Sequence, residues 1–319
     1  MRHVPVLLNE VTDALQLKPG MQVVDCTLGD AGHAEKILEK ITTEDGPRKG
    51  PSGPRGKLLG IDADIESILR AKQYLYNFGE QAIFVRDNFV NLSKIVAEQK
   101  FSPVNGILLD LGWSSPQFEE RGRGFSFIKP DEKLDMRYGS GGKTASELLN
   151  ELDESELEKI FREYGEEKLS REIAKAVTEK RKTKVIEQVG DLVEIILAVY
   201  RTKLNTEKTV PWVGGLHPAT KVFQALRIAV NDELGVIEKV LPQAIEVLAP
   251  SGSAGSPQGG RLAVITFHSL EDRIVKHYFQ KQNNKTIKIV TKKPIICSKE
   301  ESKSNPRAGS AKLRVVEKI

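Results

Sequence analysis

The chain has 319 residues, of which 39% are hydrophobic and 29% charged, and its formal net charge is +4. This length predicts a large domain with an insertion, or two domains, and the charge is compatible with a polyanionic partner. The two cysteines, Cys26 and Cys297, exclude a disulfide framework and a cysteine metal site. No signal peptide or membrane-spanning run is found, so we expect a cytoplasmic protein without membrane contact.

Strand-like and helix-like stretches alternate in the first third of the chain. Apolar runs predict strands over residues 21–27, 57–61, 81–85 and 107–109, and helical spacing follows over residues 33–41, 65–76 and 92–99. This alternation predicts an α/β fold with a doubly wound parallel sheet. Strands resume at residues 261–267, 286–291 and 311–318. We expect a helix over residues 269–278 with Ser269 and Asp272 as its capping pair.

The middle of the chain lacks strand patterns. Between about Phe118 and Val210 only helices and loops are expected, one of them with a capping box at Ser155 and Glu158. We therefore divide the chain into a first sheet part (1–117), an inserted helical domain (118–211) and a second sheet part (212–319). Residues 46–56 and 251–260 are rich in Gly, Pro and Ser and are interpreted as surface loops.

The most informative segment is residues 106–117, GILLDLGWSSPQ. An apolar run ends there in Asp110, and a turn with Trp113, Ser114 and Ser115 follows. Such runs are typical of buried parallel strands that carry a site at their carboxyl ends. A carboxylate, an aromatic face and two hydroxyl groups suit a flat ring with an amino group, which points to chemistry on a nucleobase.

The first strand is followed by the turn Gly29-Asp30-Ala31-Gly32. The turn lacks the three glycines of the dinucleotide fingerprint, and Asp25 and Asp30 would repel a diphosphate. A sulfonium cofactor tolerates these acids, so the turn favours S-adenosylmethionine. Asp62 could accept hydrogen bonds from ribose hydroxyls or cap the following helix. The segment 87–89 could hold adenine, or it could be a capping pair followed by a core phenylalanine.

Eight motifs in this order resemble those of the bacterial 16S ribosomal RNA cytosine-N4 methyltransferase family (small subunit methyltransferase H), essentially from end to end. They are HVPVLLNEV (3–11), DCTLGDAGHAEKIL (25–38), DLGWSSPQ (110–117), RGFSF (123–127), LDMR (134–137), FQALRIAVNDEL (223–234), ITFHSLEDRIVK (265–276) and NPRAGSAKLRVVEK (305–318).

The resemblance implies a class I, Rossmann-like methyltransferase fold with an inserted helical domain and S-adenosyl-L-methionine as cofactor. It also implies methylation of a cytosine N4 amine in the decoding region of 16S rRNA, with the small ribosomal subunit as partner. Family members commonly carry glycine at the position of Ala31. The cofactor contacts implied by the family are Ala31, Gly32, His33, Asp62, Phe89, Asp110 and Gln117.

Catalysis is assigned to Asp110, Trp113, Ser114 and Ser115. Asp110 could stabilise charge that develops on the amine, or it could serve the methionine amino group of the cofactor alone. Trp113 could stack on the cytosine or pack under the insertion. His268 could act as a general base, but hydrogen bonding to neighbouring backbone is favoured.

Basic and aromatic residues predict RNA contacts, because unstacked RNA bases are read by stacking and phosphates by cations. The alternatives are core packing for the phenylalanines and solvated helix ends for the basic residues. The predicted RNA-binding residues are Arg123, Phe125, Phe127, Lys180, Arg181, Lys182, Arg307, Lys312 and Arg314.

The sequence bears on three other possible functions. An NAD-dependent oxidoreductase conflicts with the glycine count and the acidic first turn. A methyltransferase for DNA or a small molecule conflicts with the family resemblance. A non-catalytic, cofactor-binding ribosome-assembly factor stays as the alternative, because a fold does not dictate activity. The sequence leaves the choice between monomer and homodimer open.

Overall fold

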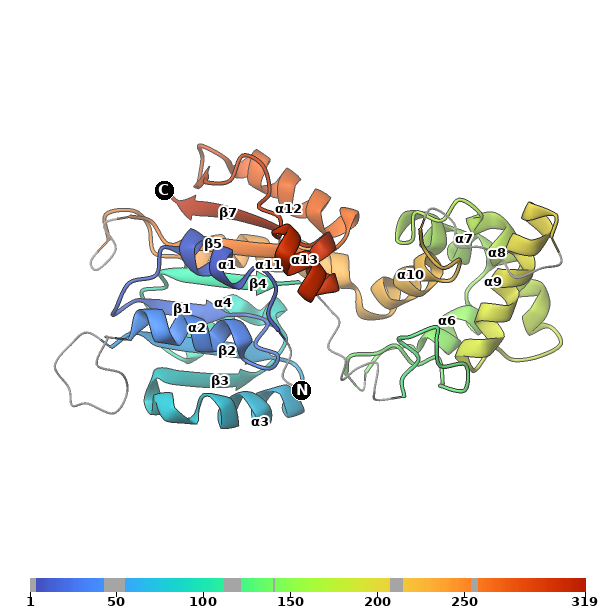
Figure 1. The fold of residues 1–319 in the computed structure, drawn as a ribbon, viewed down its shortest axis with the longest axis horizontal. Helices are drawn as coiled ribbons and strands as arrows, with labels where there is room; N and C mark the ends of the chain where they lie inside the picture. Colours follow the sequence, from blue (N-terminus) through green and yellow to red (C-terminus); the bar gives the residue numbers. More distant parts are fainter. Residues whose placement is uncertain (1–3, 43–54, 112–121, 140, 207–214, 254–257) are drawn as a thin grey trace. The chain divides into compact units, whose positions relative to one another are not determined.

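The structure is a computed structural model that describes residues 4–42, 55–111, 122–139, 141–206, 215–253 and 258–319. The chain forms two compact units (Figure 1). The sheet unit comprises residues 1–113 and 234–319, and the helical unit comprises residues 114–233. The second division therefore lies further along the chain than the expected boundary at residue 212.

One seven-stranded sheet forms the centre of the sheet unit, in the order β3-β2-β1-β4-β5-β7-β6 (Figure 1). Strands β1 to β5 are parallel, whereas β7 runs antiparallel to both β5 and β6. The expected α/β class is confirmed, but the sheet is mixed and not wholly parallel. The strands are β1 (Gln22–Asp25), β2 (Lys57–Asp62), β3 (Ala82–Arg86), β4 (Gly106–Asp110), β5 (Arg261–Thr266), β6 (Ile287–Ile289) and β7 (Lys312–Lys318).

Helices cover both faces of this sheet, because alternate residues of each strand point to opposite sides. In β4, Ile107 and Leu109 join one core with residues of α4, α11 and α12, and Leu108 joins another with residues of α1, α2 and α3. The helices of this unit are α1 (Leu8–Leu15), α2 (Gly32–Ile41), α3 (Ile65–Tyr74), α4 (Leu92–Glu98), α11 (Glu233–Val247), α12 (Ser269–Gln282) and α13 (Lys299–Ser304), with 3-10 turns at Tyr76–Gln81, Phe89–Asn91 and Pro306–Ser310.

The helical unit has a core of its own, built from the apolar faces of its helices. Leu157 and Phe161 of α7 pack with Ile173 and Val177 of α8, and all four are fully buried. The helices are α6 (Ala145–Glu151), α7 (Glu154–Glu163), α8 (Ser170–Arg181), α9 (Val189–Leu204) and α10 (Thr220–Asn231). Among the described residues, no helix combines the length and hydropathy needed to cross a bilayer.

Two predicted helix caps were wrong. The capping box of α7 is Asp153 with Glu156, two residues before the predicted pair. The capping box of α12 is His268 with Glu271, one residue before Ser269 and Asp272. Local sequence offered several acceptors in each case, and the backbone conformation at the end of the preceding segment selects which one caps the helix.

Asp272 binds Arg314 of β7 instead of capping α12. Arg314 donates from Nε to Asp272 Oδ1 at 2.7 Å and from Nη2 to Oδ2 at 3.1 Å. Arg314 is only 8% exposed. Burial alone would raise the pKa of Asp272, but hydrogen bonds and charge from Arg314 and Lys312 lower it below its usual value. This two-bond ion pair joins α12 to the antiparallel strand.

We predict that Asp272→Ala lowers the free energy of unfolding by about 3 kcal/mol, because it leaves the Arg314 guanidinium buried without its partner. Since the folded pKa of Asp272 is depressed, the contribution of the pair is present above the unfolded pKa and is lost as pH falls through the folded pKa. Denaturant unfolding across the acid range measures both effects. Lys312→Gln, which removes a 3.5 Å contact to the same carboxylate, is the control. A loss below about 1 kcal/mol for Asp272→Ala would contradict this assignment.

Candidate active site

Three carboxylates end neighbouring parallel strands of the sheet unit. Asp25 ends β1, Asp62 ends β2 and Asp110 ends β4. Because β2, β1 and β4 are adjacent and parallel, their carboxyl ends share one edge of the sheet, where ligands bind in open α/β folds. The sequence predicted Asp62 and Asp110 as site residues, and the structure brings them to this common edge.

The turn between β1 and α2 has an unusual backbone. Gly29 and Ala31 both adopt the left-handed region, with φ of 49° and 59°. Ala31 is fully buried and stands directly before the first residue of α2. A Cβ on Gly32 would lie 3.0 Å from the Pro5 ring, so this position is tight. The left-handed conformation at residue 31 gives a physical reason for glycine at this position in the resembling family.

Asp62 is held by two backbone N–H groups. Its Oδ2 accepts from Gly29 at 2.9 Å and its Oδ1 accepts from Asp64 at 2.8 Å. Asp64, not Asp62, caps α3, so the capping alternative for Asp62 is wrong. Burial raises the pKa of Asp62, while the two N–H donors oppose that shift. A carboxylate has about four lone-pair sites, so Asp62 can accept further hydrogen bonds.

His33 lies in the first turn of α2 beside two of the carboxylates. Its Nε2 is 2.9 Å from the Val6 carbonyl, which only accepts, so Nε2 carries a proton. Its Nδ1 is 3.7 Å from Asp110 Oδ2. Burial lowers the pKa of His33, and the charge of Asp25 opposes this. Burial also raises the pKa of Asp25 to about 6, opposed by His33 and by the Thr27 N–H.

Thr27 is a positioning residue that sequence reasoning missed. Its backbone N–H donates to Asp25 Oδ1 at 3.0 Å, and its Oγ1 accepts from the Asp110 backbone N–H at 2.8 Å. It therefore ties the end of β1 to the end of β4. Its place two residues beyond a strand-terminal acid is a weak signal, which only the pairing of β1 with β4 makes specific.

Phe89 follows β3 in the 3-10 turn Phe89–Asn91 and is half-buried against the core. The preceding polar side chains are used locally. Asp87 Oδ1 accepts from Asn91 Nδ2 at 2.9 Å, and Asn88 Oδ1 accepts from the Val90 N–H at 2.9 Å. These contacts match the capping interpretation of the segment. Trp113, Ser114, Ser115 and Gln117 lie outside the described residues.

His268 is the N-cap of α12, and its Nδ1 lies 3.5 Å from the donating Glu271 N–H. Its Nε2 is 3.1 Å from Glu271 Oε1. The imidazole is thus engaged with the first turn of its own helix. The contact to the Glu271 N–H agrees with the favoured interpretation that His268 bonds to neighbouring backbone.

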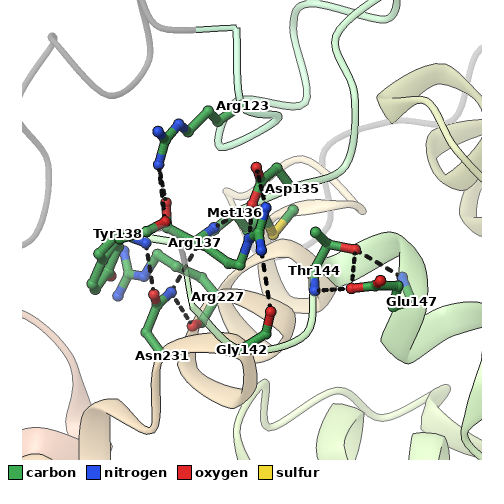
Figure 2. Close-up of polar contacts among 11 residues, drawn as sticks. Arg123, Asp135, Met136, Arg137, Tyr138, Gly142, Thr144, Glu147, Arg227 and Asn231 are labelled. Carbon is green, nitrogen blue, oxygen red and sulfur yellow. Dashed lines mark hydrogen bonds and ion pairs between the residues drawn. The ribbon is translucent and has the colours of Figure 1, made fainter.

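The predicted RNA-binding residues near the start of the insertion are built into the helical unit. Arg123 donates from Nη1 to the Arg137 carbonyl at 2.9 Å (Figure 2). The same nitrogen donates to the Gly139 carbonyl at 3.3 Å. Phe125 stacks on Tyr138 with ring centroids 5.8 Å apart. Phe127 stacks on His217 at 4.5 Å and is half-buried against the core.

Hydrogen bonds from Asn231 join α10 to the segment that contains the LDMR motif (134–137). Asn231 accepts from the Tyr138 N–H at 2.9 Å and donates to the Met136 carbonyl at 2.8 Å (Figure 2). Arg137 donates from Nε to Asp135 at 2.6 Å and from Nη1 to the Gly142 carbonyl at 3.2 Å. Sequence reasoning singled out these motifs but not their mutual contacts.

The basic residues predicted to bind RNA differ in whether their side chains already have partners within the protein. Arg181 donates to the Leu149 and Leu152 carbonyls at the end of α6, and Lys182 pairs with Glu179 at 2.8 Å. Lys180 is exposed and Arg307 is half-buried. Arg314, also predicted to bind RNA, is buried, and its guanidinium is already bound to Asp272 within the sheet unit.

The strand order 3-2-1-4-5-7-6, with acids at the ends of β1, β2 and β4, defines a class I S-adenosylmethionine-dependent methyltransferase fold. A family profile described as the MraW methylase family matches residues 1–319. The chain belongs to this family.

Relatives of known name agree with this assignment. Ribosomal RNA small subunit methyltransferase H of Heliobacterium modesticaldum is 43% identical, covering 99% of this chain and 98% of the relative. The protein of that name from Dictyoglomus thermophilum is 44% identical, covering 99% of this chain and 96% of the relative. Among solved structures, an rRNA methylase from Streptococcus thermophilus covers 98% of this chain and 92% of its own, with 11% identity and a TM-score of 0.40.

We predict that Ala31→Gly leaves the free energy of unfolding within about 1 kcal/mol, because relief of the left-handed strain offsets the loss of a buried methyl group. Ala31→Val should cost more than about 2 kcal/mol, since a branched Cβ is strained at positive φ and overfills a buried site. Denaturant titrations of both variants provide the measurement. Equal stability of the two variants would contradict the left-handed turn.

Proposed function

We propose that this protein transfers a methyl group from S-adenosyl-L-methionine to the N4 amine of a cytosine in the decoding region of 16S rRNA. The observation that carries the proposal is the end-to-end match to relatives named ribosomal RNA small subunit methyltransferase H. Its partner is then the small ribosomal subunit or its RNA, and its location is the cytoplasm, where bacterial ribosomes are assembled.

The residues at the sheet edge fit this cofactor. Asp62 offers remaining lone pairs to a ribose diol, and the Gly29–Gly32 turn allows close backbone approach. The acidic edge suits a cationic sulfonium and an ammonium better than a diphosphate. When bound, S-adenosylmethionine supplies a methyl group activated by the sulfonium. We assign its binding to Ala31, Gly32, His33, Asp62, Phe89, Asp110 and Gln117.

The chain's own contribution to the reaction is alignment and electrostatics. A cytosine amine is a poor nucleophile because its lone pair is delocalised into the ring, so positioning it in line with the methyl group lowers the barrier. Asp110, held by Thr27 and close to His33, can accept an N–H from an amine as positive charge develops. We assign contacts with the cytosine base to Trp113, Ser114 and Ser115. The proton that the amine loses after methyl transfer can pass to solvent.

We assign RNA recognition to the helical unit. Arg123, Phe125 and Phe127 combine a guanidinium with two rings at the start of that unit. Lys180 in the last turn of α8 and Lys182 at its C-cap add positive charge. The rings are stacked on Tyr138 and His217, so they could present fixed faces to an unstacked base. Lys312 and Arg307 add cations in the sheet unit.

The proposal is tested by transfer of tritium from labelled S-adenosylmethionine to small ribosomal subunits isolated from cells that lack the modification. We expect label in 16S rRNA at a single cytosine N4. Tight cofactor binding without label in the RNA would instead identify a non-catalytic assembly factor.

We predict that Asp62→Ala weakens S-adenosylmethionine binding about ten- to a hundredfold, because it removes hydrogen bonds to a charged acceptor. Isothermal titration calorimetry measures this effect. Asp64→Asn, which changes the neighbouring carboxylate but keeps an α3 cap, serves as the matched control and should bind nearly as well as the unchanged protein. Unchanged affinity in Asp62→Ala would refute the ribose role.

We predict that Asp110→Asn lowers turnover at saturating cofactor by about a hundredfold or more, since charge stabilisation at the reacting amine is weakened. Single-turnover label transfer provides the rate, and calorimetry establishes saturation. Near-normal turnover together with weakened cofactor binding would contradict a role of Asp110 in the chemistry. Asp110 would then serve only to bind the methionine amino group of the cofactor.

A further inference from the structure

The positive charge of this chain is concentrated in one segment. Residues 273–298 contain seven Lys or Arg residues and no Asp or Glu. The net charge of the whole chain is +4, so the rest of the chain has a net charge of −3. The seven residues are Arg273, Lys276, Lys281, Lys285, Lys288, Lys292 and Lys293.

Helix α12 arranges the first of these residues on one face. Val275 and Phe279 are buried in the same core cluster as Ile287 of β6 and Val316 of β7. Figure 1 shows α12 beside β7. The exposed residues of the following turns recur at helical spacing and are Arg273, Lys276, His277, Gln280 and Lys281. Lys285 continues the exposed series just beyond the end of α12. We call Arg273, Lys276, Lys281 and Lys285 the α12 basic face.

The lysine side chains of the α12 basic face make no polar contact that would stabilise the described part of the chain. There, the ammonium groups of Lys276, Lys281 and Lys285 form neither an ion pair nor a hydrogen bond. By contrast, Lys182 pairs with Glu179 and Lys184 with Asp191. Like charges gathered without counter-charges repel one another, so folding alone gives no reason to collect them.

The position of α12 connects this face to the candidate active site. The helix starts just beyond β5, whose Ile265 lies opposite Asp110 in the parallel pairing with β4. The basic face therefore begins near the sheet edge that carries the carboxylates. It then extends for about 20 Å at 1.5 Å per residue, with roughly one cation in each 5.4 Å turn.

We propose that the α12 basic face binds the phosphodiester backbone of the RNA that flanks the target base. The inference rests on the proposed function, because it takes RNA as the substrate, and it adds a contact surface on the sheet unit. A row of cations along α12 and just beyond its end suits a chain of phosphates, which it binds by releasing counterions and without reading sequence.

The test replaces three lysines together, in Lys276→Gln/Lys281→Gln/Lys285→Gln, which keeps chain length and helix propensity. We expect affinity for 16S rRNA to fall about tenfold or more near 0.1 M salt, and the log–log salt slope to become shallower by about two. The KM for small subunits should rise, whereas turnover at saturating RNA and the affinity for S-adenosylmethionine should not change.

The matched control is Lys40→Gln/Lys57→Gln/Lys94→Gln, which removes the same charge from exposed positions on other elements of the sheet unit. It should leave the salt slope nearly unchanged. Equal slopes for the two triple variants would overturn the inference while the methylation assay still supports the proposed function. An effect seen with intact subunits but not with protein-free RNA would also overturn it, because the partner would then be a protein. A further outcome is that the unchanged protein transfers no methyl group while the three-lysine variant still shows a shallower salt slope for RNA binding. In that case the proposed function fails and the inferred RNA-binding surface stands.

Discussion

Carboxylates at the ends of parallel strands, one buried and two half-buried, are the constraint on which this structure depends. Such groups are costly to bury unless backbone or side-chain donors satisfy them. Asp62 accepts from the Gly29 and Asp64 N–H groups, and Asp25 accepts from Thr27. The left-handed turn that precedes α2 supplies one of these donors. The conformation of the turn and the placement of the acids therefore depend on each other.

The rest of the sheet unit supports this edge. Two apolar cores cover the two faces of the sheet, so the strands cannot shift in register without exposing buried side chains. The Asp272–Arg314 pair fastens the antiparallel strand β7 to α12. The chain leaves the sheet at Asp110, builds the helical unit with its separate core, and returns through α11. An insertion after β4 begins next to Asp110 of the candidate active site and does not change the order of the strands in the sheet.

Sequence predicted the strands, the inserted helices and two of the three edge carboxylates as site residues, because apolar runs ending in acids are local signals. Contacts between distant segments were not predictable in this way. Thr27 gains its role only when β1 pairs with β4, and Arg314 looked like a surface cation until β7 placed it beside Asp272. The caps of α7 and α12 were misplaced by one or two residues for a related reason. Neighbouring acceptors are equivalent in sequence but not in backbone conformation.

The central claim is that the cofactor binds at the edge formed by Asp25, Asp62 and Asp110. A crystal structure with S-adenosylhomocysteine tests it most directly. The account predicts both ribose hydroxyls within hydrogen-bonding distance of Asp62, the ligand sulfur on the side of Asp110 and the Gly29–Gly32 turn against the ligand. A ligand bound at the opposite edge of the sheet, or one that leaves Asp62 without contact, would contradict it.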